Sequence, residues 1–163
     1  MALRVLLTKG LLLGMLGLGL AACAGDTGRL GKNVAGKSAA PGSVEDFSLN
    51  VGDRVFFETD QSSLTSTARA TLQRQATWLK TYRAVRVRIE GHADERGTRE
   101  YNIALGARRA SATRSYLVSL GVSPRRIRVT SFGKERPVAT CDNISCWSQN
   151  RRAETKVVGA PSS

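Results

Sequence analysis

The segment "AVRVRIEGHADERGTREYNIALGARRASAT" (residues 84–113) contains the pattern that decides the fold. Its first part alternates between apolar and charged side chains, which predicts a half-buried strand whose apolar side is formed by Val85, Val87 and Ile89. A polar loop follows, and residues 101–120 then have the spacing of a helix that stops at Gly121. Folds of the α/β class place ligand sites in such loops between a strand and a helix.

Further elements flank this unit on both sides. The stretch "DRVFFETD" (53–60) predicts a short strand, and apolar residues at helical spacing over 64–79 predict a helix after it. "RRIRVTS" (125–131) alternates again, and "NRRAETKVV" (150–158) predicts a last, weaker strand. The order β-α-β-α-β-β with short loops favours an α/β sandwich, with two main helices packed on a small mixed sheet.

The first 22 residues predict a targeting signal that is not part of the fold. Residues 10–20 (GLLLGMLGLGL) are an apolar run too short to span a bilayer stably, and basic residues precede it. "LAAC" (20–23) then resembles the bacterial lipobox, in which the chain is cut before a cysteine that is lipidated. Lipidation of Cys23 would anchor an otherwise soluble protein, and Ala24 in place of Asp indicates the outer membrane. The alternative is an ordinary signal peptide with an incidental cysteine.

Residues 23–43 are expected to form the lipidated cysteine and a flexible tether, because Gly, Ala and Ser dominate without an apolar period. Such a tether has a root-mean-square reach of about 25 Å. "GKNVAGKS" (31–38) loosely resembles a phosphate-binding loop, but no strand precedes it and no apolar helix follows, so no nucleotide site is expected. The folded domain is expected over 44–158 and a disordered tail over 159–163.

The composition is strongly basic, with a formal net charge of +12. A basic surface suggests an anionic partner such as lipid headgroups or a polymer with carboxylates, although spaced arginines can also simply solvate the surface. Nucleic acid is not expected as a partner, because the chain is predicted to be exported and no aromatic-rich strand offers a stacking platform.

Two cysteines, Cys141 and Cys146, flank the four residues "DNIS". An exported chain meets an oxidising compartment, so a disulfide that closes this loop is favoured and would contribute roughly 2 kcal/mol. Two free thiols are the alternative. A metal site is not expected, because only His92 could join the pair and no fourth zinc ligand is evident.

Arg109 falls within the apolar arc of the helix predicted over 101–120, and Asn102 lies on nearly the same line. A buried arginine needs an acceptor, because an unpaired buried charge is costly. The acceptor could be Asp94 or Glu95 in a structural ion pair, or the side chain could extend to water. It could equally be the carboxylate of a ligand, and spacing alone leaves these alternatives open.

The motif "EGHADERGTREYNIALGARRASAT" (90–113) strongly resembles the signature of the peptidoglycan-associated lipoproteins (Pal), in the OmpA C-terminal-like domain family. "FFETD" (56–60), "SFGKERP" (131–137) and "NRRAE" (150–154) stand where that family has its other common motifs. Two positions depart from the pattern: Arg99 stands where Pro is common, and Ala107 replaces a frequent acidic residue.

The resemblance implies non-covalent binding of peptidoglycan through the diaminopimelate residue of its stem peptide. Asp94 would take the ammonium group and Arg109 the carboxylate, as the principal pair. The other residues expected to line the same pocket are Asp60, Asn102, Arg151 and Arg152. The resemblance implies neither catalysis nor a cofactor, and a structural or pocket-lining role is expected for His92.

The same resemblance implies a tether between the outer membrane and the cell wall that faces the periplasm. TolB and other Tol proteins would be partners, in a system that serves envelope integrity and cell division. The alternatives are a related peptidoglycan-binding lipoprotein outside the Tol–Pal system, or a peptidoglycan hydrolase that uses Glu95 or His92.

Overall fold

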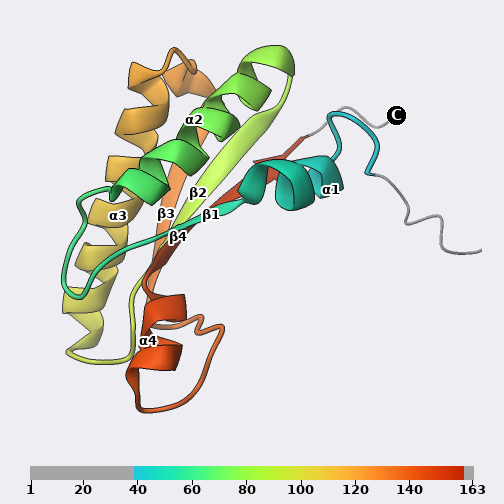
Figure 1. The fold of residues 1–163 in the computed structure, drawn as a ribbon. Coiled ribbons are helices and arrows are strands. Elements are labelled where there is room, and N and C mark those ends of the chain that lie inside the picture. The colour runs from blue at the N-terminus through green and yellow to red at the C-terminus, as the bar shows by residue number, and fades with distance from the viewer. Residues whose placement is uncertain (1–38, 160–163) are drawn as a thin grey trace, which may run out of the picture. The chain divides into compact units, whose positions relative to one another are not determined.

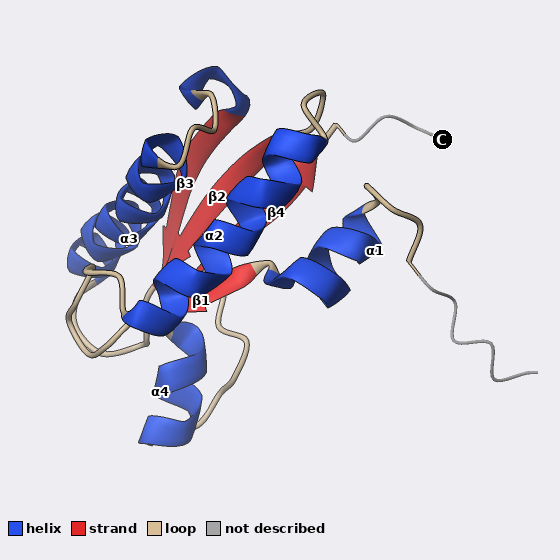
Figure 2. Cartoon of the chain, turned by 45° about the horizontal axis from the view of Figure 1, so that its top comes forward, coloured by secondary structure: helices blue, strands red, loops and turns tan. Residues whose placement is uncertain are grey.

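The computed structural model describes residues 39–159. The predicted signal, Cys23, most of the predicted tether and residues 160–163 lie outside the described part. A four-stranded sheet has two long helices, α2 and α3, packed on one face (Figures 1 and 2). No helix within residues 39–159 is long and apolar enough to cross a membrane.

The elements follow the predicted β-α-β-α-β-β order, with additional short helices. In chain order they are α1 (Val44–Asp46), η1 (Phe47–Gly52), β1 (Arg54–Phe56), α2 (Ser66–Thr81), β2 (Arg86–His92), α3 (Arg99–Ser119), η2 (Pro124–Arg126), β3 (Ile127–Gly133), α4 (Ile144–Asn150) and β4 (Arg152–Val158). The two-helix sandwich on a mixed sheet is thus confirmed. The sequence did not predict α1 and η1 before β1, or α4 before β4.

The sheet has the strand order β1-β4-β2-β3. β2 runs parallel to β3 and antiparallel to β4, and β1 runs antiparallel to β4. Because the last strand enters the middle of the sheet, its first residues lie beside the carboxyl end of β2, where Ala153 pairs with Gly91. The end of α4 therefore lies next to the loop between β2 and α3.

The core lies between the sheet and the two long helices. Val87 and Ile89 alternate inward from β2, as predicted, and pack with buried side chains of α2 and α3 that include Leu72, Leu79 and Leu117. The predicted alternation is confirmed over residues 86–89, where Arg86 and Arg88 are exposed, but Glu90 is buried too, and so is the rest of the strand to His92.

Two glycines allow α3 to approach the end of β2 closely. A Cβ atom on Gly91 would lie 1.9 Å from the carbonyl oxygen of Gly106, so neither position has room for a larger residue. Thr98 caps the start of α3, because its hydroxyl accepts a hydrogen bond from the Tyr101 N–H at 3.2 Å. The start of α3 therefore fixes the end of the loop 93–98, which contains Asp94, Glu95 and Arg96.

Candidate functional site

A cavity of about 300 Å³ lies at the carboxyl end of β2. Three segments form it: the loop after β1, the loop after β2 and the first turns of α3. Its lining residues are Thr59, Asp60, Asp94, Arg96, Gly97, Tyr101, Asn102 and Leu105. The structure thus brings together three of the residues that the resemblance suggested, namely Asp60, Asp94 and Asn102.

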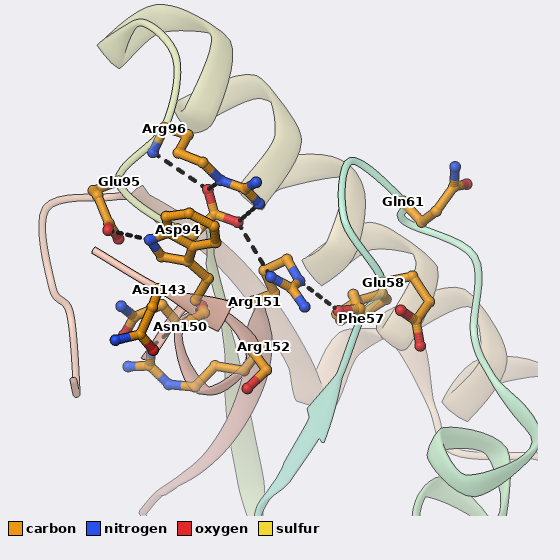
Figure 3. Close-up of polar contacts among 12 residues, drawn as sticks. Phe57, Glu58, Gln61, Asp94, Glu95, Arg96, Asn143, Asn150, Arg151 and Arg152 are labelled. Atoms are coloured by element: carbon orange, nitrogen blue, oxygen red, sulfur yellow. Dashed lines mark hydrogen bonds and ion pairs between the residues drawn. The ribbon is translucent and has the colours of Figure 1, made fainter. Parts of the chain in front are cut away.

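Asp94 is buried, and two arginines contact its carboxylate (Figure 3). Arg96 donates from Nη2 to Oδ2 at 2.7 Å and from Nε to Oδ1 at 3.1 Å, and Arg151 donates from Nη1 to Oδ2 at 3.4 Å. Burial alone would raise the pKa of the Asp94 carboxyl, but the hydrogen bonds and charge of Arg96 and the contact with Arg151 lower it below its usual value. Asp94 is therefore an anion at neutral pH.

Arg109 is fully buried, with a relative exposure of 0%. Its guanidinium donates to three main-chain carbonyls: Nε to Gln61 at 2.8 Å, Nη1 to His92 at 2.8 Å and Nη2 to Glu58 at 3.2 Å. Burial lowers the pKa of Arg109 to about 10, so the side chain is still a cation at neutral pH.

The structural alternatives proposed for Arg109 from the sequence are therefore wrong. Arg109 forms no ion pair with Asp94 or Glu95, and it does not extend to water. Arg109 does have acceptors, but they are main-chain carbonyls of the loop after β1 and of the end of β2. Arg109 fastens the loop after β1 to the end of β2, and it is not itself a lining residue of the cavity.

The two consecutive arginines at the start of β4 point in opposite directions. Arg151 is buried, donates from Nε to the Phe57 carbonyl at 3.0 Å and reaches Asp94. Arg152 instead donates to Glu154 Oε1 at 2.6 Å and lies on the sheet face away from α2 and α3. The structure thus places Arg151 beside Asp94, but it does not bring Arg152 to this cavity.

The remaining predicted residues organise the rim of the cavity. Asn102 is buried and donates from Nδ2 to the carbonyl of Arg96 at 2.7 Å, which fixes the loop after β2. Asp60 accepts a hydrogen bond from the Tyr101 hydroxyl. Its φ of 58° is in the left-handed region, where a non-glycine residue is uncommon and often marks a functional loop.

Two residues at the site, Arg96 and Trp147, were missed by the sequence reasoning. The guanidinium carbon of Arg96 lies 4.1 Å from the ring centroid of Trp147, whose indole N–H donates to Glu95. Trp147 belongs to α4 and directly follows the Cys141–Cys146 disulfide, whose Cα atoms are 5.6 Å apart. The disulfide predicted from the sequence is present. The cysteine pair lies a few residues before the "NRRAE" motif, and this short separation was the available signal that Trp147 lies near the site.

His92 is buried at 2% exposure and stacks on Phe132 with ring centroids 5.7 Å apart. Neither ring nitrogen has a hydrogen-bond partner within the described residues. Burial, and secondarily the charge of Arg152, lower its pKa to about 4, so the ring is neutral at physiological pH. Within residues 39–159 no group of three or more His, Cys, Asp or Glu side chains is arranged to bind a metal.

Comparison with known proteins places this geometry in a family. A model described as the OmpA family matches residues 56–151. The chain belongs to the OmpA family. The family expected from the sequence is thereby confirmed.

The relatives agree with this assignment. The peptidoglycan-associated lipoprotein of Mesorhizobium japonicum is 62% identical over 133 residues, covering 82% of this chain and 79% of that protein. The protein of the same name from Pseudomonas aeruginosa is 49% identical over 123 residues, covering 75% of this chain and 73% of its own.

Solved structures show the same fold. The crystal structure of the peptidoglycan-associated lipoprotein from Burkholderia pseudomallei aligns with a TM-score of 0.67 and 37% identity, over 71% of this chain and all of that chain. The C-terminal domain of Helicobacter pylori MotB aligns with a TM-score of 0.62 at 22% identity, over 67% of this chain and 86% of that domain. At that identity the likeness shows the fold alone.

Replacement of Arg109 should destabilise the domain. Arg109→Ala leaves three main-chain carbonyls without this donor and empties the space of a large buried side chain, so we expect a loss of at least about 3 kcal/mol in the free energy of unfolding. Urea denaturation measures this. Arg108→Ala, on the exposed side of the same helix, is the control and should change stability by no more than about 0.5 kcal/mol. Equal stability of the two variants would contradict the carbonyl contacts.

His92 should make the domain less stable in mild acid. The unfolded chain takes up a proton near pH 6.5, whereas the folded chain does so only near pH 4. The stability contribution of the neutral ring is therefore complete above pH 6.5 and is lost as the pH falls toward 4, up to roughly 3 kcal/mol. Glu154, with a pKa lowered to about 2, loses its own contribution below pH 4.5.

Urea midpoints at pH 7.5 and pH 4.8 isolate the contribution of His92. The difference between the two midpoints should be large in the natural protein and much smaller in His92→Leu. The same pH dependence in both proteins would show that the buried ring is not the cause.

Proposed function

We propose that this protein is a non-enzymatic lipoprotein that binds peptidoglycan non-covalently through the diaminopimelate of the stem peptide. One observation supports the site most strongly: Asp94 is a buried carboxylate, kept ionised by arginines, at the base of a cavity of about 300 Å³. Such a volume suits the end of one amino acid side chain better than a sugar chain. Relatives that are 49–62% identical have the name peptidoglycan-associated lipoprotein.

The chemistry of the site suits a zwitterion. The side chain of diaminopimelate ends in an ammonium group and a carboxylate on one carbon. Asp94 and Asp60 provide acidic groups for the ammonium. Arg109 adds positive charge near the cavity without lining it, because its guanidinium is buried and donates to three main-chain carbonyls.

Two contacts favour binding over the hydrolase alternative. A general acid or base must reach the substrate and titrate near the working pH. His92 is buried with a pKa of about 4, and the Glu95 carboxylate accepts the indole N–H of Trp147. His92 therefore does not meet these conditions, and the contact of Glu95 with Trp147 gives that carboxylate a structural role.

The membrane attachment belongs to the same proposal. A lipid on Cys23 would fix the protein to the outer membrane facing the periplasm, and the tether would let the domain reach the wall. Attachment raises the local concentration of the domain at the wall, so a modest affinity suffices. Partnership with TolB and other Tol proteins in envelope integrity and cell division is the extension of this proposal, and a lipoprotein with the same wall contact outside that system is the alternative.

Asp94→Asn should abolish binding without loss of the fold. The amide keeps the shape but removes the charge that faces the ammonium, so we expect at least tenfold weaker co-sedimentation with purified diaminopimelate-type peptidoglycan, since a charged hydrogen bond contributes about 1.5–3 kcal/mol. Free diaminopimelate should compete with the wall. Glu45→Gln, an exposed charge removal in α1, is the matched control and should sediment normally. Undiminished sedimentation of Asp94→Asn would refute the site.

Cys23→Ser should release the protein from the membrane fraction and prevent incorporation of labelled palmitate. The double variant Cys141→Ser/Cys146→Ser removes the other two cysteines and should remain in the membrane fraction. Palmitate on the Cys23→Ser protein would show that the lipobox prediction is wrong.

A further inference from the structure

Arg96 is the guanidinium that lines the cavity. It comes from the loop after β2, and its side chain is 42% exposed, whereas Arg109 has no exposed surface. Arg96 belongs to the lining together with Asp60, Asp94 and Asn102. A carboxylate that enters the cavity from solvent can therefore contact Arg96 but not Arg109.

The hydrogen bonds of Arg96 leave part of its guanidinium available. Nε and Nη2 both donate to the Asp94 carboxylate, so one edge of the planar group is used. Nη1 donates no hydrogen bond to any described residue, and Nη2 has a second N–H. The outer edge of the guanidinium thus retains the parallel N–H pair that binds a carboxylate in bidentate fashion.

Trp147 holds the guanidinium of Arg96 in position. The guanidinium carbon of Arg96 is 4.1 Å from the indole centroid, a contact that attracts the cation to the ring face while its in-plane N–H groups stay available for hydrogen bonds (Figure 3 shows the surrounding contacts). The ring is itself oriented, because its N–H donates to Glu95, the neighbour of Arg96 in the loop.

The disulfide segment explains why Trp147 is in this place. α4 has only seven residues, and Asn143 caps its start by accepting from the Ser145 N–H at 3.0 Å. The Cys141–Cys146 bond closes the chain immediately before Trp147. The carboxyl end of α4 is fixed by Arg151, which reaches both Phe57 and Asp94. One short helix thus delivers two side chains to the surroundings of Asp94.

We propose that Arg96 is a specificity-determining residue that binds the terminal carboxylate of the ligand, and that Trp147 is its positioning residue. This inference rests on the proposed function. Asp94 receives the ammonium group on the cavity side, and Arg96, already paired with Asp94, presents its outer edge to the carboxylate on the same carbon. The side chain of a lysine in a stem peptide has the ammonium but lacks that carboxylate, so Arg96 distinguishes the two kinds of stem peptide.

A competition experiment with wall binding as the readout tests the role of Arg96. Purified peptidoglycan is incubated with the full-length protein in detergent, and two stem tripeptides that end in meso-diaminopimelate or in lysine are titrated as the diaminopimelate and lysine competitors. The α-amino group of each last residue is in a peptide bond, so only the diaminopimelate peptide has an ammonium and a carboxylate on one carbon. The measured quantity is the ratio of the two inhibition constants. In the natural protein diaminopimelate should compete much better than lysine. In Arg96→Gln the advantage of diaminopimelate should fall about tenfold, the loss expected for one charged bidentate contact.

The ratio of the two inhibition constants separates a loss of specificity from a general structural effect. Loss of loop structure weakens both competitors together and leaves the ratio unchanged. Removal of Arg96 also frees Asp94 from a competing cation, so lysine should bind as well as before or better. Trp147→Ala should lower the ratio in the same direction, whereas Trp147→Phe keeps an aromatic face and should preserve most of it.

The outcomes distinguish this inference from the proposed function. An unchanged ratio in Arg96→Gln, in a background where Asp94→Asn abolishes wall binding, overturns the role of Arg96 and leaves the proposed site intact. Wall binding that persists in Asp94→Asn and that neither competitor reduces overturns the proposed function itself.

Discussion

The buried guanidinium of Arg109 is the interaction on which the rest of the site depends. A cation inside a protein is costly unless its N–H groups find acceptors, and here main-chain carbonyls of Glu58, Gln61 and His92 accept them. Because these carbonyls belong to the loop after β1 and to the end of β2, the fold must bring the two segments together to satisfy one side chain. The cavity lies directly above this junction. Arg109 therefore holds the segments that form the cavity in place, although its own side chain does not line the cavity.

The zwitterionic ligand proposed for the cavity is consistent with the charges around it. Three carboxylates, those of Asp60, Asp94 and Glu95, lie in the same neighbourhood as the guanidinium groups of Arg96, Arg109 and Arg151. A ligand end with one ammonium and one carboxylate keeps this balance, whereas an ammonium alone adds an uncompensated charge in a partly buried place, where electrostatic interactions are stronger than in water.

The sequence predicted the parts of this arrangement that depend on side-chain periodicity. β2 and α3 are long and regular, and the position of Arg109 on an apolar helix face correctly indicated a buried cation. Its acceptors could not be predicted, because main-chain carbonyls leave no trace in a residue pattern. Arg152 illustrates a different limit: successive strand residues point to opposite faces, so two consecutive arginines cannot both enter one cavity, but the pattern alone does not say which one does. α4 was missed because seven mostly polar residues have too little apolar period.

α4 also shows how a short element can be precise enough to serve a site. An isolated helix of two turns is unstable in water, since nucleation fixes several residues for few hydrogen bonds. Here a disulfide joins Cys146 in the helix to Cys141 before it, a side-chain cap satisfies the first turn, and Arg151 connects the end of the helix to Phe57 and Asp94. Each of these constraints acts on a different part of the segment, so Trp147, which lies between them, has little freedom. Because the indole in turn orients Arg96, covalent closure of a surface loop determines the direction of a charge at the cavity mouth.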